Sequence, residues 1–170
     1  QLTVAAVTPL AEQPARRPAG AADAAAADAG VRLMFRTKGI ERRATVLAEG
    51  DAGQIIEISL RGKHGDASAN ELIAYVRETV EKLDPAGVIM NLGNFSYSFG
   101  NDIGALLTPL LGRHAGKRRE FCIVARGRTS RSLRSLFELT NHPDIVGARY
   151  FEDARDALIY VKRALAGDTV

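Results

Sequence analysis

Two periods of apolar residues alternate along this chain and mark its expected elements. Short runs rich in β-branched and aromatic residues predict strands at 31–37, 43–49, 54–62, 87–92, 120–125 and 148–151. Apolar residues three and four positions apart predict helices between or after these runs. The residues that carry this second period are Leu72, Ile73, Val76, Val80, Leu83; Ile103, Leu106, Leu107, Leu110, Leu111; Leu133, Leu136, Phe137; and Ala154, Ala157, Leu158, Val161, Leu165.

Strands that alternate with helices through short connections are typical of an α/β domain. We expect a mixed, mostly parallel sheet of about five strands with about four helices. Gly50, Asp51 and Gly53 predict a hairpin turn between the runs at 43–49 and 54–62, which supplies an antiparallel part. The almost wholly apolar run at 87–92 predicts a central strand covered on both faces.

Several polar residues stand where helices should begin. Asp66 or Ser68 could cap the first helix, and Thr129 or Ser130 the third. Pro109 lies inside the second helical pattern and removes a backbone donor there. We therefore expect this helix to kink or to change its last turn.

Composition divides the chain into two parts. Residues 1–30 hold twelve alanines and three of the six prolines, with little large apolar surface, which predicts a flexible tail before a domain at 31–170. Over the whole chain, 46% of residues are hydrophobic and 25% are charged, as in ordinary globular proteins.

No apolar run approaches the ~20 residues that a membrane-spanning helix needs, and the N-terminus lacks the order of a signal peptide. We therefore expect no membrane insertion and a cytoplasmic location. The single cysteine, Cys122, lies in the apolar run "FCIV" and is expected to be a buried strand residue rather than a reactive thiol.

Positive charge is concentrated in one stretch. The net charge of the chain is only +3, but Arg113 to Arg134 holds eight basic residues and one acidic residue, Glu120. Such a stretch can contact phosphate, nucleic acid or an acidic protein, and it can equally be a solvated face. Nucleic acid is not among the partners that we expect.

Catalytic and metal-binding signatures are absent from the sequence. The histidines, at 64, 114 and 142, have no cysteine or carboxylate at metal-ligand spacing. The common dinucleotide, phosphate-loop and hydrolase motifs are missing as well. Glu71, Glu78, Glu81 and Asp84 follow the polar side of the first helix, as a solvated surface or an acidic partner-binding face. We expect no enzyme activity and no cofactor.

Two loops combine features of a binding surface. "GNFSYSFGN" follows the strand at 87–92 and "RGRTS" follows the strand at 120–125, so both should lie at the carboxyl edge of the sheet. Asn101 would then share one surface with Arg126, Arg128, Thr129 and Ser130, which suits an anion or an acidic protein. The alternative is a capping asparagine beside solvated arginines.

The stretch "VIMNLGNFSYSFGNDIGALL", from Val88 to Leu107, resembles the strand, turn and helix of the STAS domain, the family of sulfate-transporter C-terminal domains and bacterial anti-sigma factor antagonists. Family members read something like "VVLDLSGVSFIDSSGLGALL", with no gap needed. "FELTNHPDIVGARYFEDARDALIYV" is similar to the family's ending. The resemblance covers Gln54 to Leu165 and implies a STAS-like fold.

The resemblance also implies a site. Antagonists of the family carry a serine or threonine that a partner kinase phosphorylates, and Asn101 stands at that position, with Asp102 where a glycine follows it. Asparagine has no hydroxyl, so the usual switch is missing. The implied partner-binding residues are Phe95, Ser96, Tyr97, Ser98, Phe99, Gly100, Asn101 and Asp102.

We therefore expect a non-catalytic interaction module of bacterial partner-switching signalling and transcription regulation. Its implied partner is an anti-sigma factor of the histidine-kinase-like ATPase type, and a homodimer is left open. The alternative is an anion- or nucleotide-binding or scaffold module, for example with a transporter, in which Arg126, Arg128, Thr129 and Ser130 hold the anion.

Overall fold

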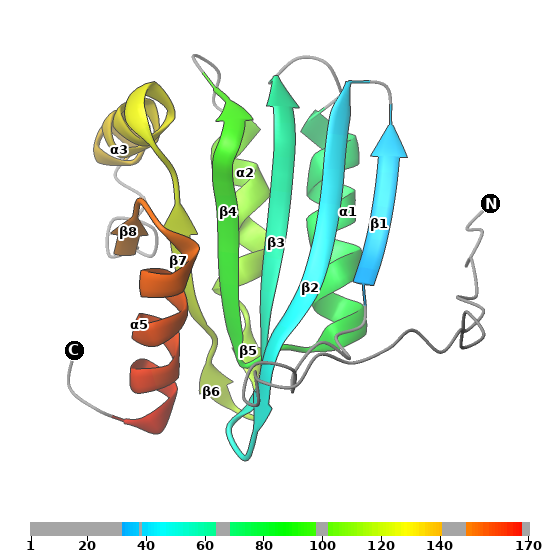
Figure 1. The fold of residues 1–170 in the computed structure, drawn as a ribbon, viewed down its shortest axis with the longest axis vertical. Coiled ribbons are helices and arrows are strands. Elements are labelled where there is room, and N and C mark those ends of the chain that lie inside the picture. The colour runs from blue at the N-terminus through cyan, green and yellow to red at the C-terminus, as the bar shows by residue number, and fades with distance from the viewer. Residues whose placement is uncertain (1–31, 38, 64–68, 98–101, 141–148, 168–170) are drawn as a thin grey trace, which may run out of the picture.

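The computed structural model describes residues 32–37, 39–63, 69–97, 102–140 and 149–167. The expected tail at 1–30 and the expected cap residues Asp66 and Ser68 lie outside these ranges. The described residues form one α/β unit, drawn in Figure 1, with four α-helices and one 3₁₀ helix.

The main sheet contains six strands in the order β1-β2-β3-β4-β7-β8, one more than the count of about five that we expected. β1 and β2 pair antiparallel, as do β2 and β3, and all remaining neighbours are parallel. The mixed, mostly parallel sheet is therefore confirmed. Its strands are β1 (Arg32–Thr37), β2 (Ile40–Gly50), β3 (Gly53–Lys63), β4 (Gly87–Ser96), β7 (Glu120–Val124) and β8 (Arg149–Phe151).

The predicted hairpin is also confirmed. β2 and β3 pair as far as Gly50 and Gly53, across the turn at Asp51 and Ala52. Gly53 has a φ of +109°, a conformation that side-chain-bearing residues rarely adopt. The glycine therefore lets the chain reverse within a few residues.

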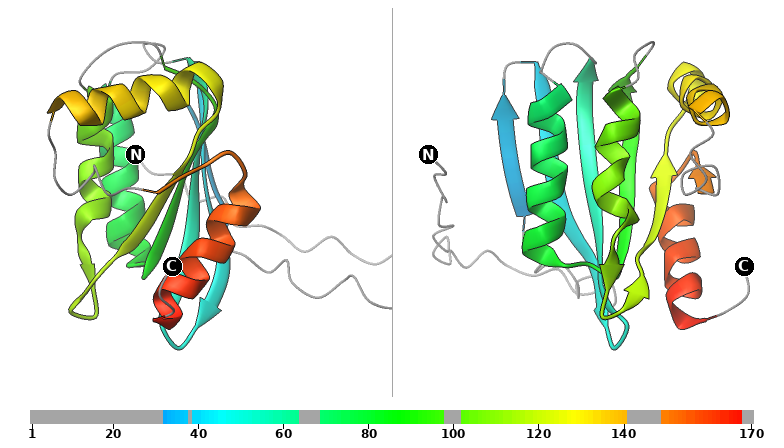
Figure 2. Two further views of the ribbon diagram at one scale, coloured as in Figure 1. Left: turned by 90° about the vertical axis from the view of Figure 1, so that its left-hand side faces the viewer. Right: turned by 180° about the vertical axis from the view of Figure 1, so that it is seen from behind.

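Helices cover the two faces of the sheet unequally, as Figure 2 shows from two sides. α1 (Ala69–Leu83) and α2 (Asp102–Leu107) pack on one face, where residues of β2, β3 and β4 complete the larger core. α5 (Ala154–Ala166) packs on the other face against β4 and β7. α3 (Gly127–Thr140) lies at the carboxyl end of β7 and adds Leu133 to the larger core.

The helices cover the sheet only in part, and this explains how β4 differs from the predicted central strand that is covered on both faces. Gly87 to Met90 are buried, as expected for a central strand, but Asn91 is only half-buried and its amide donates to Glu57 on the open part of the sheet. Ser59 pairs with Asn91 and Arg61 with Asn94, so β4 contains one extra residue there. The side chain of Asn91 accepts from the Gly93 N–H at 3.0 Å and so stabilises this bulge.

Pro109 acts on α2 as predicted. The α-helix ends at Leu107 and continues as the 3₁₀ helix η1 (Thr108–Leu111), with the proline in its first turn. Proline has no backbone N–H, and in the first turn of a helix this N–H would have no partner within the helix. Gly112, with an extended backbone, follows η1.

One pair of strands was not predicted. β5 (Arg113–His114) and β6 (Lys117–Arg118) form a separate two-stranded hairpin between η1 and β7. Ala115 and Gly116 in its turn both have positive φ, +48° and +79°. The strands are polar and two residues long, and alanine is an unusual residue for such a turn, so this hairpin has no strand signal in the sequence.

Candidate functional site

The end of β4 and the start of α3 meet through one side chain. The hydroxyl of Thr129 donates to the carbonyl of Phe95 at 2.9 Å and accepts from the N–H of Tyr97 at 3.4 Å. Thr129 is 8% exposed, so both bonds lie away from water. The expectation that these two loops are neighbours is therefore confirmed.

This contact corrects the expected role of Thr129 as a helix cap. α3 begins at Gly127, two residues earlier, so neither Thr129 nor Ser130 stands before its first turn. The sequence suggested a cap because hydroxyls commonly bond nearby backbone groups. In this fold the hydroxyl instead satisfies backbone groups of β4 and of the residue that follows it.

The predicted partner-binding loop presents its side chains unequally. Phe95 and Tyr97 are 2% and 3% exposed, and both belong to the larger core. Ser96 between them is exposed. The buried aromatic residues hold the backbone in place, and the serine faces the solvent.

The structure describes only part of the rest of the predicted partner-binding segment, residues 98–102. Ser98, Phe99, Gly100 and Asn101 lie outside the described residues. Asp102 is the first residue of α2.

Arg126 contacts the two residues that precede α5. Its Nε donates to the carbonyl of Glu152 at 2.6 Å, and a terminal nitrogen lies 3.7 Å from the carboxylate of Asp153. Asp153 is also the cap of α5, accepting from the N–H of Arg155 at 2.7 Å. Arg126 thus links the loop after β7 to the start of α5.

The other arginines of α3 differ in their surroundings. Arg128 and Arg131 are exposed and have no hydrogen-bond or ion-pair partner among the described residues. Arg134 lies over the ring of Tyr150, 4.9 Å from its centre. Ser130 is half-buried, with its N–H donating to the carbonyl of Arg126. Arg128 and Arg131 therefore offer positive charge that is not engaged with the described residues.

The basic stretch from Arg113 to Arg134 does not form one surface. Figure 1 shows the β5–β6 hairpin at the opposite end of the sheet from α3. Arg113, Lys117 and Arg118 are exposed at that hairpin, while Arg119 is 5% exposed. The stretch folds across the length of β7, which separates its charges.

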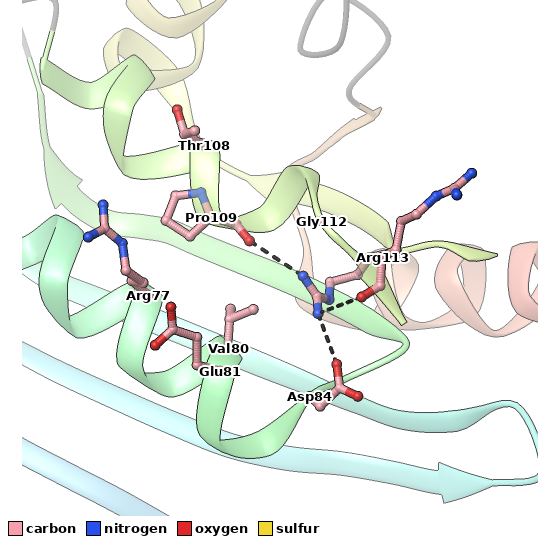
Figure 3. A pocket seen from close by; sticks show the side chains of 9 residues that line it. Arg77, Val80, Glu81, Asp84, Thr108, Pro109, Gly112 and Arg113 are labelled. Atoms are coloured by element: carbon pink, nitrogen blue, oxygen red, sulfur yellow. Dashed lines mark hydrogen bonds and ion pairs between the residues drawn. The ribbon is translucent and has the colours of Figure 1, made fainter. Parts of the chain in front are cut away.

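Arg119 holds several backbone segments together, a role that could not be predicted from the sequence. Its Nε donates to the carbonyl of Pro85 at 2.7 Å. Its terminal nitrogens contact the carbonyls of Pro109 and Arg113, both at 3.4 Å, and the Asp84 carboxylate at 3.2 Å. Figure 3 draws the last three contacts as dashed lines. A run of arginines reveals charge, whereas burial of one of them depends on segments distant in the sequence.

The described residues include one thiol, that of Cys122. Cys122 is fully buried, as predicted, and burial raises the pKa of its thiol to about 12. The thiolate that would act as a nucleophile is therefore disfavoured. No group of histidine, cysteine and carboxylate side chains that could hold a metal ion lies in the part of the chain that the structure describes. None of its helices is long and apolar enough to span a bilayer.

Comparison with solved structures identifies the fold. The chain is similar to the crystal structure of an anti-sigma factor antagonist from Mycobacterium paratuberculosis, with 18% sequence identity and a TM-score of 0.51. The match covers 79% of this chain and 95% of the other. The chain therefore has a STAS-like fold, as the resemblance of residues 88–107 implied.

Two structures of RuvC from Thermus thermophilus, one of them in complex with a Holliday junction substrate, align at 17% and 16% identity over 81% of this chain. The alignments cover 95% and 94% of the two RuvC chains. Their TM-score is 0.30 in both cases, which does not indicate a shared fold. No model of a known protein family matches the sequence, and no curated protein matches it.

Proposed function

We propose that this chain is a non-catalytic protein–protein interaction module that acts in cytoplasmic partner-switching signalling and transcription regulation in bacteria. The observation that carries the proposal is the STAS-like fold, found also in an anti-sigma factor antagonist at a TM-score of 0.51. The proposed partner is an anti-sigma factor of the histidine-kinase-like ATPase type. To bind this partner, the chain needs a surface of fixed shape and no reactive groups.

The proposed docking face consists of residues 95–102 and 126–130. Support comes from the Thr129 hydroxyl, which bonds Phe95 and Tyr97 and so fixes the end of β4 against α3. A backbone held in this way loses less conformational entropy when a partner binds. Ser96 and Arg128 are neighbours of these residues in sequence, are exposed, and are proposed to touch the partner.

The module is proposed to lack the usual phosphorylation switch. A phosphate adds about −1.5 to −2 charges and can turn attraction at a contact into repulsion. Asn101, at the position that the resemblance assigns to the phosphate acceptor, has no hydroxyl to modify. Binding to the partner would then persist when ATP is present.

The test uses the full chain as bait in an extract of the native cell, with captured proteins identified by mass spectrometry. An ATPase of the stated type is then purified, and its affinity is measured by calorimetry. Asn101→Arg and Arg128→Glu should each weaken binding at least tenfold. Lys162→Glu makes the same charge change as Arg128→Glu on an exposed position of α5 and should have no effect.

Phosphate transfer is measured in the same complex. With ATP, phosphate should appear on Asn101→Ser at the new serine and should be absent from that position in the wild type. The proposal is wrong if no such ATPase is captured, or if Arg128→Glu and Lys162→Glu leave its affinity equally unchanged.

An anion-binding or scaffold role is a second candidate, favoured by the exposed guanidinium groups of Arg128 and Arg131. It has less support than partner docking because the Arg126 guanidinium and the Thr129 hydroxyl are already engaged within the protein. Binding of inorganic phosphate that weakens with salt and is lost in Arg128→Gln would favour this role.

A further inference from the structure

A surface pocket lies at the end of the molecule opposite α3. It has a volume of about 370 Å³ and is formed where the end of α1 faces η1 and the start of β5. Figure 3 shows it from close by. Its lining residues are Arg77, Val80, Glu81, Asp84, Thr108, Pro109, Gly112, Arg113 and Arg119.

Buried contacts fix part of the wall of this pocket. The guanidinium of Arg119 is anchored to Pro85, Pro109 and Asp84, and that side chain is only 5% exposed. Gly112 leaves the space that the guanidinium occupies, because a Cβ there would lie 2.7 Å from its terminal nitrogen. The shape of the pocket is therefore set in part by a buried side chain and by backbone, and not only by exposed side chains.

The charges around the pocket are not all available to a ligand. Asp84 is paired with Arg119 at 3.2 Å, and Nδ1 of His114 lies 3.0 Å from its other carboxylate oxygen. Arg77 and Glu81, one turn apart on α1, are exposed and have no hydrogen-bond or ion-pair partner within the described ranges. One unmatched cation and one unmatched anion therefore stand beside each other at the mouth.

The lining as a whole contains three guanidinium groups and two carboxylates, so its net charge is positive. Val80 and Pro109 add apolar surface between the charged groups. This combination suits a small molecule with a carboxylate and with a hydroxyl or amino group. The carboxylate would meet a guanidinium, and the donor would meet the free carboxylate.

We propose that this pocket binds a small organic acid that carries a hydroxyl or amino group. Arg77 receives the carboxylate of the ligand, Glu81 accepts from its hydroxyl or amino group, and Val80 and Pro109 contact its carbon skeleton. A volume near the lower limit of ligand pockets, about 300 Å³, suits one such compact molecule.

The pocket is separate from the proposed docking face. α2 begins at Asp102 beside that face, and its continuation η1 ends at Leu111 beside the pocket. Binding of a small acid needs no protein partner. The inference therefore stands or falls independently of the proposed function.

The test measures binding of malate and glutamate to the full chain by ligand-observed NMR and calorimetry, at millimolar concentrations and low salt. Both probes should show saturable binding to the wild type. Arg77→Gln should weaken both at least tenfold. Arg155→Gln is the matched control, because it removes the same charge from an exposed position of α5, on the other face of the sheet, and should leave binding unchanged.

Glu81→Gln tests the second contact. It should weaken malate more than succinate, which has the same carbon chain and carboxylates but no hydroxyl. Absence of saturable binding by both probes would overturn the proposal. Equal loss of affinity in Arg77→Gln and Arg155→Gln would also overturn it, because the probes would then respond to net charge alone.

Discussion

The hydroxyl of Thr129 and the carbonyl of Phe95 form a 2.9 Å hydrogen bond between residues 34 positions apart in the sequence. Both groups are buried, so neither can exchange this bond for one to water. The contact joins α3 to the end of β4. The geometry of the proposed docking face therefore depends on one hydroxyl that a partner need never touch.

Thr129→Val should lower the free energy of unfolding by about 1–3 kcal/mol, because a buried carbonyl loses its donor while the side chain keeps its shape. Thr129→Ser keeps the hydroxyl and should cost less. Urea unfolding of the two variants measures the difference. Equal stability of Thr129→Val and the wild type would show that the bond contributes nothing net.

Arg119→Lys should destabilise the protein by about 2–4 kcal/mol, although the charge is retained. A lysine cannot donate to the carbonyls of Pro85, Pro109 and Arg113 with the fixed fork of a guanidinium. Thermal and urea unfolding provide the measurement. Arg113→Lys, at an exposed side chain, is the control and should change stability by less than about 0.5 kcal/mol.

Gly62→Ala should destabilise the protein by more than about 2 kcal/mol. Gly62 has a φ of +131°, and a Cβ there would lie 2.4 Å from the carbonyl oxygen of Gly39. Gly116→Ala separates the two causes, because Gly116 also has a positive φ, +79°, but open space around it. Gly116→Ala should lower the free energy of unfolding by about 1–2 kcal/mol, the part that comes from backbone conformation alone. Similar losses in both variants would rule out the steric contact.

Stability should fall as the pH rises above 9. Burial raises the pKa of Cys122 from 9.0 and that of Tyr75 from 10.0, in each case to about 12. The unfolded chain releases these protons first, so the contribution of each group is complete below its unfolded pKa. It is lost as the pH rises towards 12, at about 1.4 kcal/mol per pH unit.

Cys122→Ala isolates the thiol. Between pH 9 and pH 11 its unfolding free energy should decrease by about 1.4 kcal/mol less per pH unit than that of the wild type. Denaturant unfolding across this range measures both slopes. Parallel curves would mean that the thiol ionises as readily in the folded chain as in the unfolded one.

The periodic pattern of apolar residues predicted the order of the main elements because these residues are the ones that the core buries. Leu72, Val76 and Val80 line the inner side of α1, and Ala157 and Val161 that of α5. Pro109 and the turn at Gly50 and Gly53 were predictable because they act through their own backbone. Such local causes can be read without knowing the fold.

Features that depend on distant segments could not be predicted in this way. Arg119 resembles its basic neighbours in sequence, and only the meeting of α1, η1 and β5 makes it a buried anchor. Thr129 looked like a cap because its partners, Phe95 and Tyr97, lie more than 30 residues away. The pocket beside Arg77 and Glu81 arises from the same meeting of segments and left no motif.

The bonds of Arg119 also bear on the order in which the chain assembles. Its contacts with Pro85 and Asp84 span 34 and 35 residues, whereas β2 and β3 meet across a turn of two. Closing a long loop costs more entropy than closing a short one. The β2–β3 hairpin can therefore form early on the folding pathway, and the end of the molecule that holds Arg119 is expected to gain protection against amide exchange only after β7 has joined β4.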